Sequence, residues 1–183
     1  MSYLPPVMQV LLAALVVTAA AYDLRYRRIP NWLVLSGLFP GLALNLLLYG
    51  LAGLRISGAG LGLALLIYFP LYLVRAMGAG DAKLMAAIGA IVGPWNWLGI
   101  FVASALLGGL MAVILLLRRG RLGQTLINVA FIFKELASLR PPYLKHEALD
   151  VKSKAAVTMP HGAAVAAGAL GFLAAAAIWA PRA

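Results

Sequence analysis

The chain has 183 residues, of which 64% are hydrophobic and only 11% are charged. A soluble domain has about a quarter charged residues. Here the apolar residues form long runs separated by short basic patches, which is typical of membrane-spanning helices. The net charge of +10 fits cytoplasmic loops beside anionic lipid headgroups, and no basic face with interleaved aromatic residues indicates a nucleic-acid partner. The absence of cysteine excludes disulfides, thiolate metal sites and a cysteine nucleophile.

The apolar runs predict an all-α membrane protein with six membrane-spanning helices. These are Pro6–Tyr22, Trp32–Gly50, Ile56–Val74, Ala82–Gly93, Trp97–Leu117 and Val157–Ala180. The first run resembles the apolar part of a secretion signal, but such a signal begins with positive charge, and residues 1–6 carry none. We therefore expect a retained first span, with residues 1–183 forming a single membrane-embedded domain.

The distribution of charge predicts the orientation of the chain in the membrane. Placing the first loop in the cytoplasm puts 13 of the 15 Lys and Arg residues on that side, with only Arg55 and Arg182 outside. All five acidic residues also fall on the cytoplasmic side or at its membrane boundary. Because cytoplasmic loops are enriched in Lys and Arg, we expect both termini on the outer, periplasmic side.

The predicted fourth span is short. The 13 residues from Asp81 to Gly93 reach only about 20 Å as a helix, whereas a hydrocarbon core of about 30 Å needs roughly 20 residues. Either the helix continues past Pro94 with a kink, or one end lies below the membrane surface in a protein-lined cavity. We expect Trp95 and Trp97 to anchor the outer end as interfacial aromatic residues, with Asp81 drawn inward.

Between the fifth and sixth predicted spans, residues 118–156 are expected to form a cytoplasmic segment. Apolar residues recur at helical spacing between Leu122 and Leu139, which predicts an amphipathic helix lying on the membrane surface. This helix should end at Arg140-Pro141-Pro142, because proline cannot continue a helix.

Two aspartates are the candidate catalytic residues. An ionised carboxylate inside a bilayer costs about 3 kcal/mol or more, yet Asp23 ends the first span and Asp81 opens the fourth. The predicted topology puts both at the cytoplasmic face, where a helix bundle could bring them together. Two neighbouring carboxylates do not both ionise easily, so one proton is shared between them. One Asp can then act as a base toward water while the other, protonated, polarises a carbonyl.

The residues before Asp81 favour a catalytic role. Gly78 and Gly80 remove side chains on the approach, so a substrate backbone could come close. Asp81 also stands at a helix N-terminus, where the dipole and free N–H groups favour a carboxylate. A purely structural interpretation is that Asp81 caps its helix and Asp23 pairs with a nearby arginine. The occurrence of both aspartates at one membrane depth, in a chain with few acids, favours catalysis.

Two motifs resemble the signatures of the type IV prepilin peptidase family, which are intramembrane-type aspartic proteases. One is Asp23 followed by Ile29-Pro30-Asn31, and the other is Gly78-Ala79-Gly80-Asp81-Ala82-Lys83. A third match is Met159-Pro160-His161-Gly162, although the family usually has an aromatic residue where His161 stands. The resemblance, which spans nearly the whole chain, implies that Asp23 and Asp81 are the catalytic pair. The further site residues that it implies are Gly78, Gly80, Lys83, Ile29, Pro30, Asn31, Pro160 and Gly162.

The resemblance implies a leader peptidase of the bacterial inner membrane, which hydrolyses the leader of type IV prepilins at the cytoplasmic face. The partners would be a prepilin, with a basic leader and an apolar helix, and membrane lipid. No cofactor or metal is implied, since His161 and His146 stand far apart in sequence and form no metal set. Long bifunctional members carry an N-terminal insertion with paired cysteines and also N-methylate the pilin. This chain resembles the short form of tight-adherence (Flp) pilus systems, so methyltransferase activity is unsupported.

Three other functions fit the sequence less well. The presenilin and signal-peptide-peptidase group also has a Tyr-Asp motif, which Tyr22-Asp23 resembles. Members of that group are longer chains with nine spans and a Pro-Ala-Leu motif, and this motif is missing here. A small transporter or proton-coupled protein would place its ionisable groups near the membrane midplane, often within internal repeats. In this sequence both aspartates are predicted at one membrane edge, and no internal repeat is found. A non-catalytic membrane scaffold would tolerate Asp→Asn substitutions at both positions.

The remaining motif residues also have simpler structural interpretations. Pro30 would start the second helix, where its missing N–H is harmless, and Asn31 would cap that helix. Lys83 is two positions from Asp81 and so faces another side of the helix, where it would anchor a lipid headgroup. His161 would be an interfacial histidine.

Overall fold

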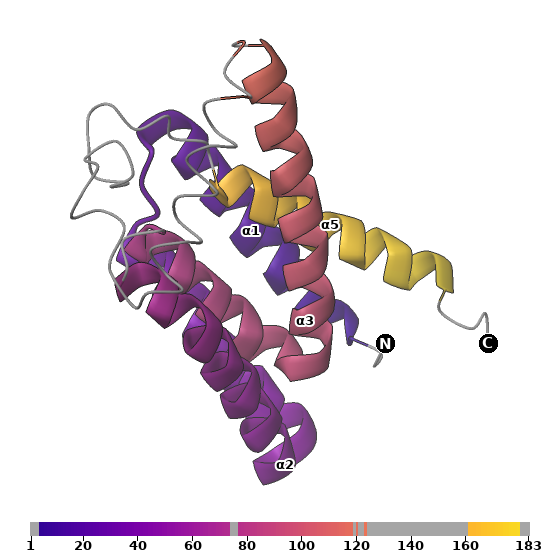
Figure 1. Cartoon of the computed structure of the whole chain (residues 1–183). Helices are drawn as coiled ribbons and strands as arrows, with labels where there is room; N and C mark the ends of the chain where they lie inside the picture. The colour runs from indigo at the N-terminus through magenta and orange to yellow at the C-terminus, as the bar shows by residue number, and fades with distance from the viewer. Residues whose placement is uncertain (1–3, 74–76, 119, 121–122, 124–160, 180–183) are drawn as a thin grey trace.

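The computed structural model describes residues 4–73, 77–118, 120, 123 and 161–179. Within these ranges the chain forms helices and no strand, as Figure 1 shows. The helices are α1 (Pro6–Tyr26), α2 (Asn31–Leu73), α3 (Ala79–Arg118) and α5 (His161–Trp179). All four are long and apolar enough to cross a membrane. The all-α prediction is thus confirmed for the described part of the chain, while six crossings and the side of the termini stay predictions.

Two predictions fall on residues that the structure does not describe. The amphipathic helix expected between Leu122 and Leu139 lies outside the described residues, and so does the beginning of the sixth span at Val157. The part of that span from His161 onward is helical and corresponds to α5.

α1 is longer than predicted. It begins at Pro6, because a missing N–H is harmless in the first turn of a helix. It ends at Tyr26, and Arg27 then adopts a left-handed conformation with φ 52° and donates its N–H to the carbonyl of Asp23 at 2.9 Å. Asp23 therefore lies in the last turn of α1 rather than after its end.

α2 and α3 are each interrupted at one glycine. Gly50 has φ 61° and ψ −148°, and Gly93 has φ 74° and ψ 174°, which are conformations that a Cβ atom disfavours. The chain is helical again immediately afterwards, at residues 51 and 94. The breaks themselves fall where the sequence predicts them. They divide α2 into arms 31–49 and 51–73, and α3 into arms 79–92 and 94–118.

The two arms of α3 fold back on each other. Trp97 Nε1 donates to the carbonyl of Met85 at 2.9 Å, although 12 positions of straight helix would separate the two residues by about 18 Å. Figure 1 shows both α2 and α3 as helical hairpins, with α5 lying across α1 and the second arm of α3. The helix therefore continues past Pro94, which is one of the two alternatives predicted from the sequence. After the break, however, its second arm runs back along the first.

Polar side chains of α2 donate hydrogen bonds to the backbone carbonyls at the end of the first arm of α3. Pro94 has no N–H, so the carbonyl of Ala90 loses its usual partner four residues on. Asn45 Nδ2 donates to the carbonyls of Ala90 and Ile91, both at 3.1 Å, and Ser57 Oγ also donates to Ala90. An unsatisfied carbonyl in an apolar surrounding costs several kcal/mol, so these bonds make the break tolerable.

The first arm of α3 is the centre of the bundle. Every residue from Leu84 to Gly93 is buried, which is typical of a helix that is apolar on all sides and enclosed by neighbours. A Cβ atom on Gly60 would overlap the backbone of Gly89, so α2 and α3 cross backbone against backbone there. Asp81 stands at the start of this central helix.

The prediction that both tryptophans anchor the outer end is wrong for Trp97. Its side chain is 0% exposed and stacks on Phe101, with ring centroids 5.4 Å apart and planes at 9°. The physical reason is that its indole N–H finds a partner inside the bundle, at Met85. Trp95 is 78% exposed, and its anchoring role stays a prediction.

Candidate active site

Asp23 is held by the beginning of the last helix. Its side chain is buried, with 8% of its surface exposed, and Oδ2 accepts the backbone N–H of Gly162 at 2.8 Å. Gly162 is the second residue of α5, where backbone N–H groups have no partner within the helix and favour a carboxylate. A Cβ atom on residue 162 would lie 2.9 Å from Cβ of Asp23 and 3.0 Å from Oδ2. Only glycine allows this approach.

Asp81 lies in the first turn of α3, as its third residue, and is half-buried. The carbonyl of Gly78 accepts the N–H of Ala82 at 3.4 Å, so Gly78 rather than Asp81 occupies the N-cap position. A Cβ atom on residue 78 would lie 3.3 Å from Oδ2 of Asp81. The carboxyl group of Asp81 therefore lies over a backbone that carries no side chain.

The two carboxyl groups come together at one end of the bundle. Asp81 is close enough to Asp23 and to His161 for their charges to interact. Asp23 comes from α1, Asp81 from α3 and His161 from α5, so three helices converge here. The structure thus brings the two candidate residues of the sequence to one place, as expected from their position at the same predicted membrane face.

The two motifs that contain these aspartates also contact each other. A Cβ atom on Gly80 would lie 3.2 Å from Cβ of Ile29, so the glycine makes room for the isoleucine against α3. Lys83 Nζ donates to Oδ1 of Asn31 at 3.0 Å, which ties the start of α3 to the start of α2. Lys83 is exposed, so this bond is accessible to solvent or lipid headgroups.

The capping role expected for Asn31 is wrong. The carbonyl of Pro30 accepts the N–H groups of Leu33 and Val34, at 3.2 and 3.4 Å, so Pro30 takes the cap position immediately before α2. Asn31 is already the first residue of the helix, and its side chain turns to Lys83 instead.

The third motif is only partly described. Pro160 lies outside the described residues, so its predicted role has no structural counterpart here. His161 begins α5 and is exposed, and Gly162 contacts Asp23 directly. Among the residues described, no group of three or more His, Asp or Glu side chains could hold a metal ion.

Residues 10–113 match the model of the type IV leader peptidase family, which covers more than half of the chain. The chain belongs to the type IV leader peptidase family. No curated protein and no solved structure gave a significant match. Membership supports a leader-peptidase-like protease of the membrane, and a prepilin-type substrate in general. The matched region includes both aspartates and both motifs around them, but ends before Gly162.

One polar residue near the two aspartates carries no signal of a site in the sequence. Tyr68, in the second arm of α2, is 5% exposed and lies within range of the charge of Asp81. It stands in the middle of the apolar run Ile56–Val74, away from every motif. A buried tyrosine in a predicted span gives no signal of a site, because its ring is ordinary core material.

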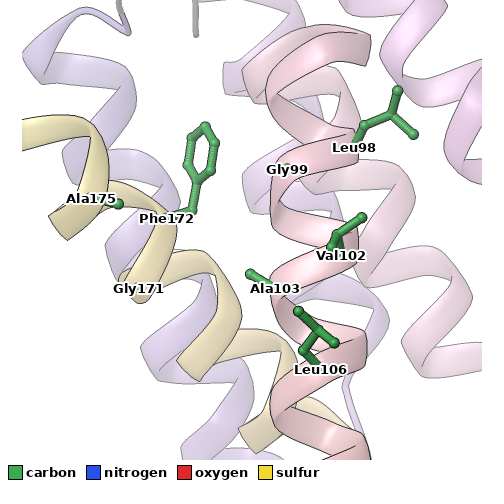
Figure 2. Close-up of a pocket in the computed structure, with 8 residues that line it drawn as sticks. All are labelled: Leu98, Gly99, Val102, Ala103, Leu106, Gly171, Phe172 and Ala175. Carbon is green, nitrogen blue, oxygen red and sulfur yellow. The ribbon is translucent and has the colours of Figure 1, made fainter. Parts of the chain in front are cut away.

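A groove in the structure lies apart from the two aspartates (Figure 2). It runs between the second arm of α3 and α5, and all its walls are apolar. Its lining includes Leu98, Val102 and Leu106 from α3, and Gly171, Phe172 and Ala175 from α5. At 1.5 Å per residue, Gly171 is about 14 Å along α5 from Gly162. The groove is therefore separate from the site of the two aspartates.

Proposed function

We propose that this chain is a prepilin leader peptidase of the aspartic type, with Asp23 and Asp81 as its catalytic pair. The observation that carries the proposal is the convergence of the two carboxyl groups, from separate helices, to within range of each other's charge. The glycines beside them support it, because Gly78 and Gly162 leave room around each carboxylate that a side chain would fill.

In this mechanism, one aspartate is ionised and takes a proton from water while the other is protonated and polarises the scissile carbonyl. The N–H of Gly162 fixes Oδ2 of Asp23, so Oδ1 is the oxygen that would accept a proton from water. Asp81, which is more exposed than Asp23, would face the substrate carbonyl. Water adds to the carbonyl carbon as Asp23 takes its proton and Asp81 gives its own proton to the carbonyl oxygen. The C–N bond then breaks as the proton on Asp23 passes to the leaving amine, and Asp81 recovers a proton from the intermediate as the carboxyl product forms.

The substrate would be a prepilin, of the Flp-like kind, with a basic leader in the cytoplasm and an apolar helix in the membrane. Both aspartates lie at the ends of apolar helices, in the last turn of α1 and the first turn of α3. That position suits cleavage where a leader meets a membrane helix. We further propose six crossings by one domain of the bacterial inner membrane, with periplasmic termini and the site at the cytoplasmic face.

A transporter is the alternative that one observation favours, because α2 and α3 are broken helices, as many transporters have. In transporters the broken backbone itself lines the ion site. Here Gly93 is 12 positions from Asp81, about 18 Å along the helix, and Asn45 and Ser57 occupy the carbonyls at the break. The peptidase is therefore the better proposal.

The test uses the purified protein in detergent or lipid vesicles together with candidate prepilins, including Flp-type ones. Mass spectrometry then looks for the loss of a leader-length peptide. We expect cleavage by the wild-type protein and none by Asp23→Asn or Asp81→Asn, with membrane insertion and thermal unfolding unchanged. Proton flux across vesicles without cleavage of any prepilin would favour the transporter instead.

A further inference from the structure

The turn of α3 that carries Asp81 is weakly held by its own backbone. The N–H of Ala82 reaches the carbonyl of Gly78 at 3.4 Å, beyond the usual range of about 2.7–3.2 Å for such a bond. Gly78 at the cap position has no side chain that could accept one of the free N–H groups of the first turn. Because helix ends with few hydrogen bonds open easily, a fixed position of Asp81 needs contacts from outside α3.

Direct packing against α1, the helix that carries Asp23, supplies little of this support. α1 packs mainly on α5 and, to a lesser extent, on α2, and few of its residues approach α3. The spacing between the two aspartates is therefore set through other elements. On the side of Asp23, the N–H of Gly162 in α5 fixes the carboxylate.

The segment 27–30, which joins α1 to α2, makes the first of two contacts with the turn that carries Asp81. A Cβ atom on Gly80 would lie 3.2 Å from Cβ of Ile29, so the isoleucine packs on the backbone immediately before Asp81. Ile29 itself stands only six positions after Asp23. A short stretch of chain thus leads from one aspartate to the neighbour of the other.

The second contact is the hydrogen bond from Lys83 Nζ to Oδ1 of Asn31, at 3.0 Å. Lys83 comes two positions after Asp81, about 200° around the helix, so this bond holds the turn from another side. Asn31 is the first residue of α2, the helix on which α3 packs most extensively. A turn held at both Gly80 and Lys83 resists unwinding and rotation about its axis, either of which would move the carboxyl group.

We propose that Lys83 and Asn31 are a positioning pair for the peptidase reaction, whose hydrogen bond keeps Asp81 at a fixed spacing from Asp23. The two side chains act through the first turn of α3 and do not touch the substrate. This inference rests on the proposed function of the two aspartates. It gives Lys83 a task distinct from anchoring a lipid headgroup, which would need no particular partner at position 31.

The experiment is a double-mutant cycle on prepilin cleavage, with Lys83→Met, Asn31→Ala and the double variant. Methionine keeps most of the lysine stem but lacks the donor. Asn31→Asp is the rescue variant, because a carboxylate at this position still accepts the bond from Lys83. Arg118→Gln is the control, since it removes an exposed positive charge from the last turn of the same helix. For each protein, kcat, KM and the unfolding temperature are measured.

We expect each single variant to lower kcat by about three- to fivefold, because an exposed bond of this kind shifts the population of the ordered turn by no more than that. KM should stay near its wild-type value, since neither side chain binds the substrate. The double variant should lose no more than either single one, because both substitutions remove the same bond. Asn31→Asp and Arg118→Gln should keep the wild-type kcat, and all the unfolding temperatures should agree.

Losses that multiply in the double variant would overturn the inference, as would a loss in Asn31→Asp equal to that in Asn31→Ala. A loss in Lys83→Met with full activity of Asn31→Ala would assign Lys83 to the lipid headgroups instead. An unfolding temperature that falls together with kcat would make the bond a structural one. Failure of the wild-type protein to cleave any prepilin is a separate outcome, which would remove the proposed function and this inference with it.

Discussion

The backbone N–H of Gly162 donates a hydrogen bond to Oδ2 of Asp23 at 2.8 Å, and so joins the first turn of the last helix to the last turn of the first. This bond orients one of the two proposed catalytic carboxylates by a main-chain group, which does not change rotamer. A carboxylate needs such fixed donors to keep one geometry through a reaction. The relationship also explains why residue 162 is a glycine.

Gly162→Ala tests this relationship. The new Cβ would lie 2.9 Å from Cβ of Asp23, so α5 or Asp23 must shift by part of an ångström. A shift of about 1 Å in a catalytic group can lower a rate about 100-fold, so we expect kcat/KM for prepilin cleavage to fall by about 10- to 100-fold. Gly171→Ala, on the same helix, is the matched control because a Cβ there meets nothing within 4 Å. Equal activity of the two variants would show that the close approach at Gly162 does not matter.

Asn45→Leu tests the polar support of the broken helix. Leucine has nearly the same shape, but the carbonyls of Ala90 and Ile91 lose the amide that bonds to both. We expect the free energy of unfolding in detergent to fall by about 1–3 kcal/mol, because the carbonyl of Ile91 loses this donor while that of Ala90 keeps only Ser57. Ser36→Ala is the control, since Ser36 bonds only within its own helix, to the carbonyl of Leu33. If Asn45→Leu is as stable as Ser36→Ala, the proposed support of the break is wrong.

Gly60→Ala tests the close crossing of α2 and α3. The added methyl group would overlap the backbone of Gly89, which has no flexible atom to move aside. Overpacking of this kind costs about 1–3 kcal/mol, measured as a lower free energy of unfolding. Gly62→Ala, two positions along the same helix, faces open space and should be neutral or more stable by up to about 1 kcal/mol. A Gly60→Ala protein as stable as Gly62→Ala would contradict the backbone contact.

Much of the fold follows from the sequence because its signals are local. Long apolar runs predict helices, glycine beside proline predicts the break at Gly93, and two acids in a nearly acid-free chain identify Asp23 and Asp81 as candidates. The same local reasoning placed the end of α1 four residues too early, since Asp23 and the basic residues after it look like a loop. In the structure they complete the last turn of the helix.

The parts that were missed depend on contacts between distant segments. Nothing local distinguishes Trp97, which is buried by its bond to Met85, from Trp95, which is exposed. The bond between Asn31 and Lys83 and the burial of Tyr68 against Trp97 and Phe101 arise only when α2 packs against α3. Gly162 is a candidate site residue in the sequence only through the family resemblance. Its physical role is evident from its hydrogen bond to Asp23.

The most direct test of the central claim is single-turnover cleavage of a prepilin by four proteins: the wild type, Asp23→Asn, Asp81→Asn and the double variant. When two residues act as one catalytic unit, removing either one also removes the contribution of the other. Each single variant should therefore lower the cleavage rate by about a thousandfold or more, and the double variant should lower it no further. Equal membrane insertion and unfolding temperature would show that the loss is chemical. Cleavage at the wild-type rate by either single variant would show that Asp23 and Asp81 are not the catalytic pair.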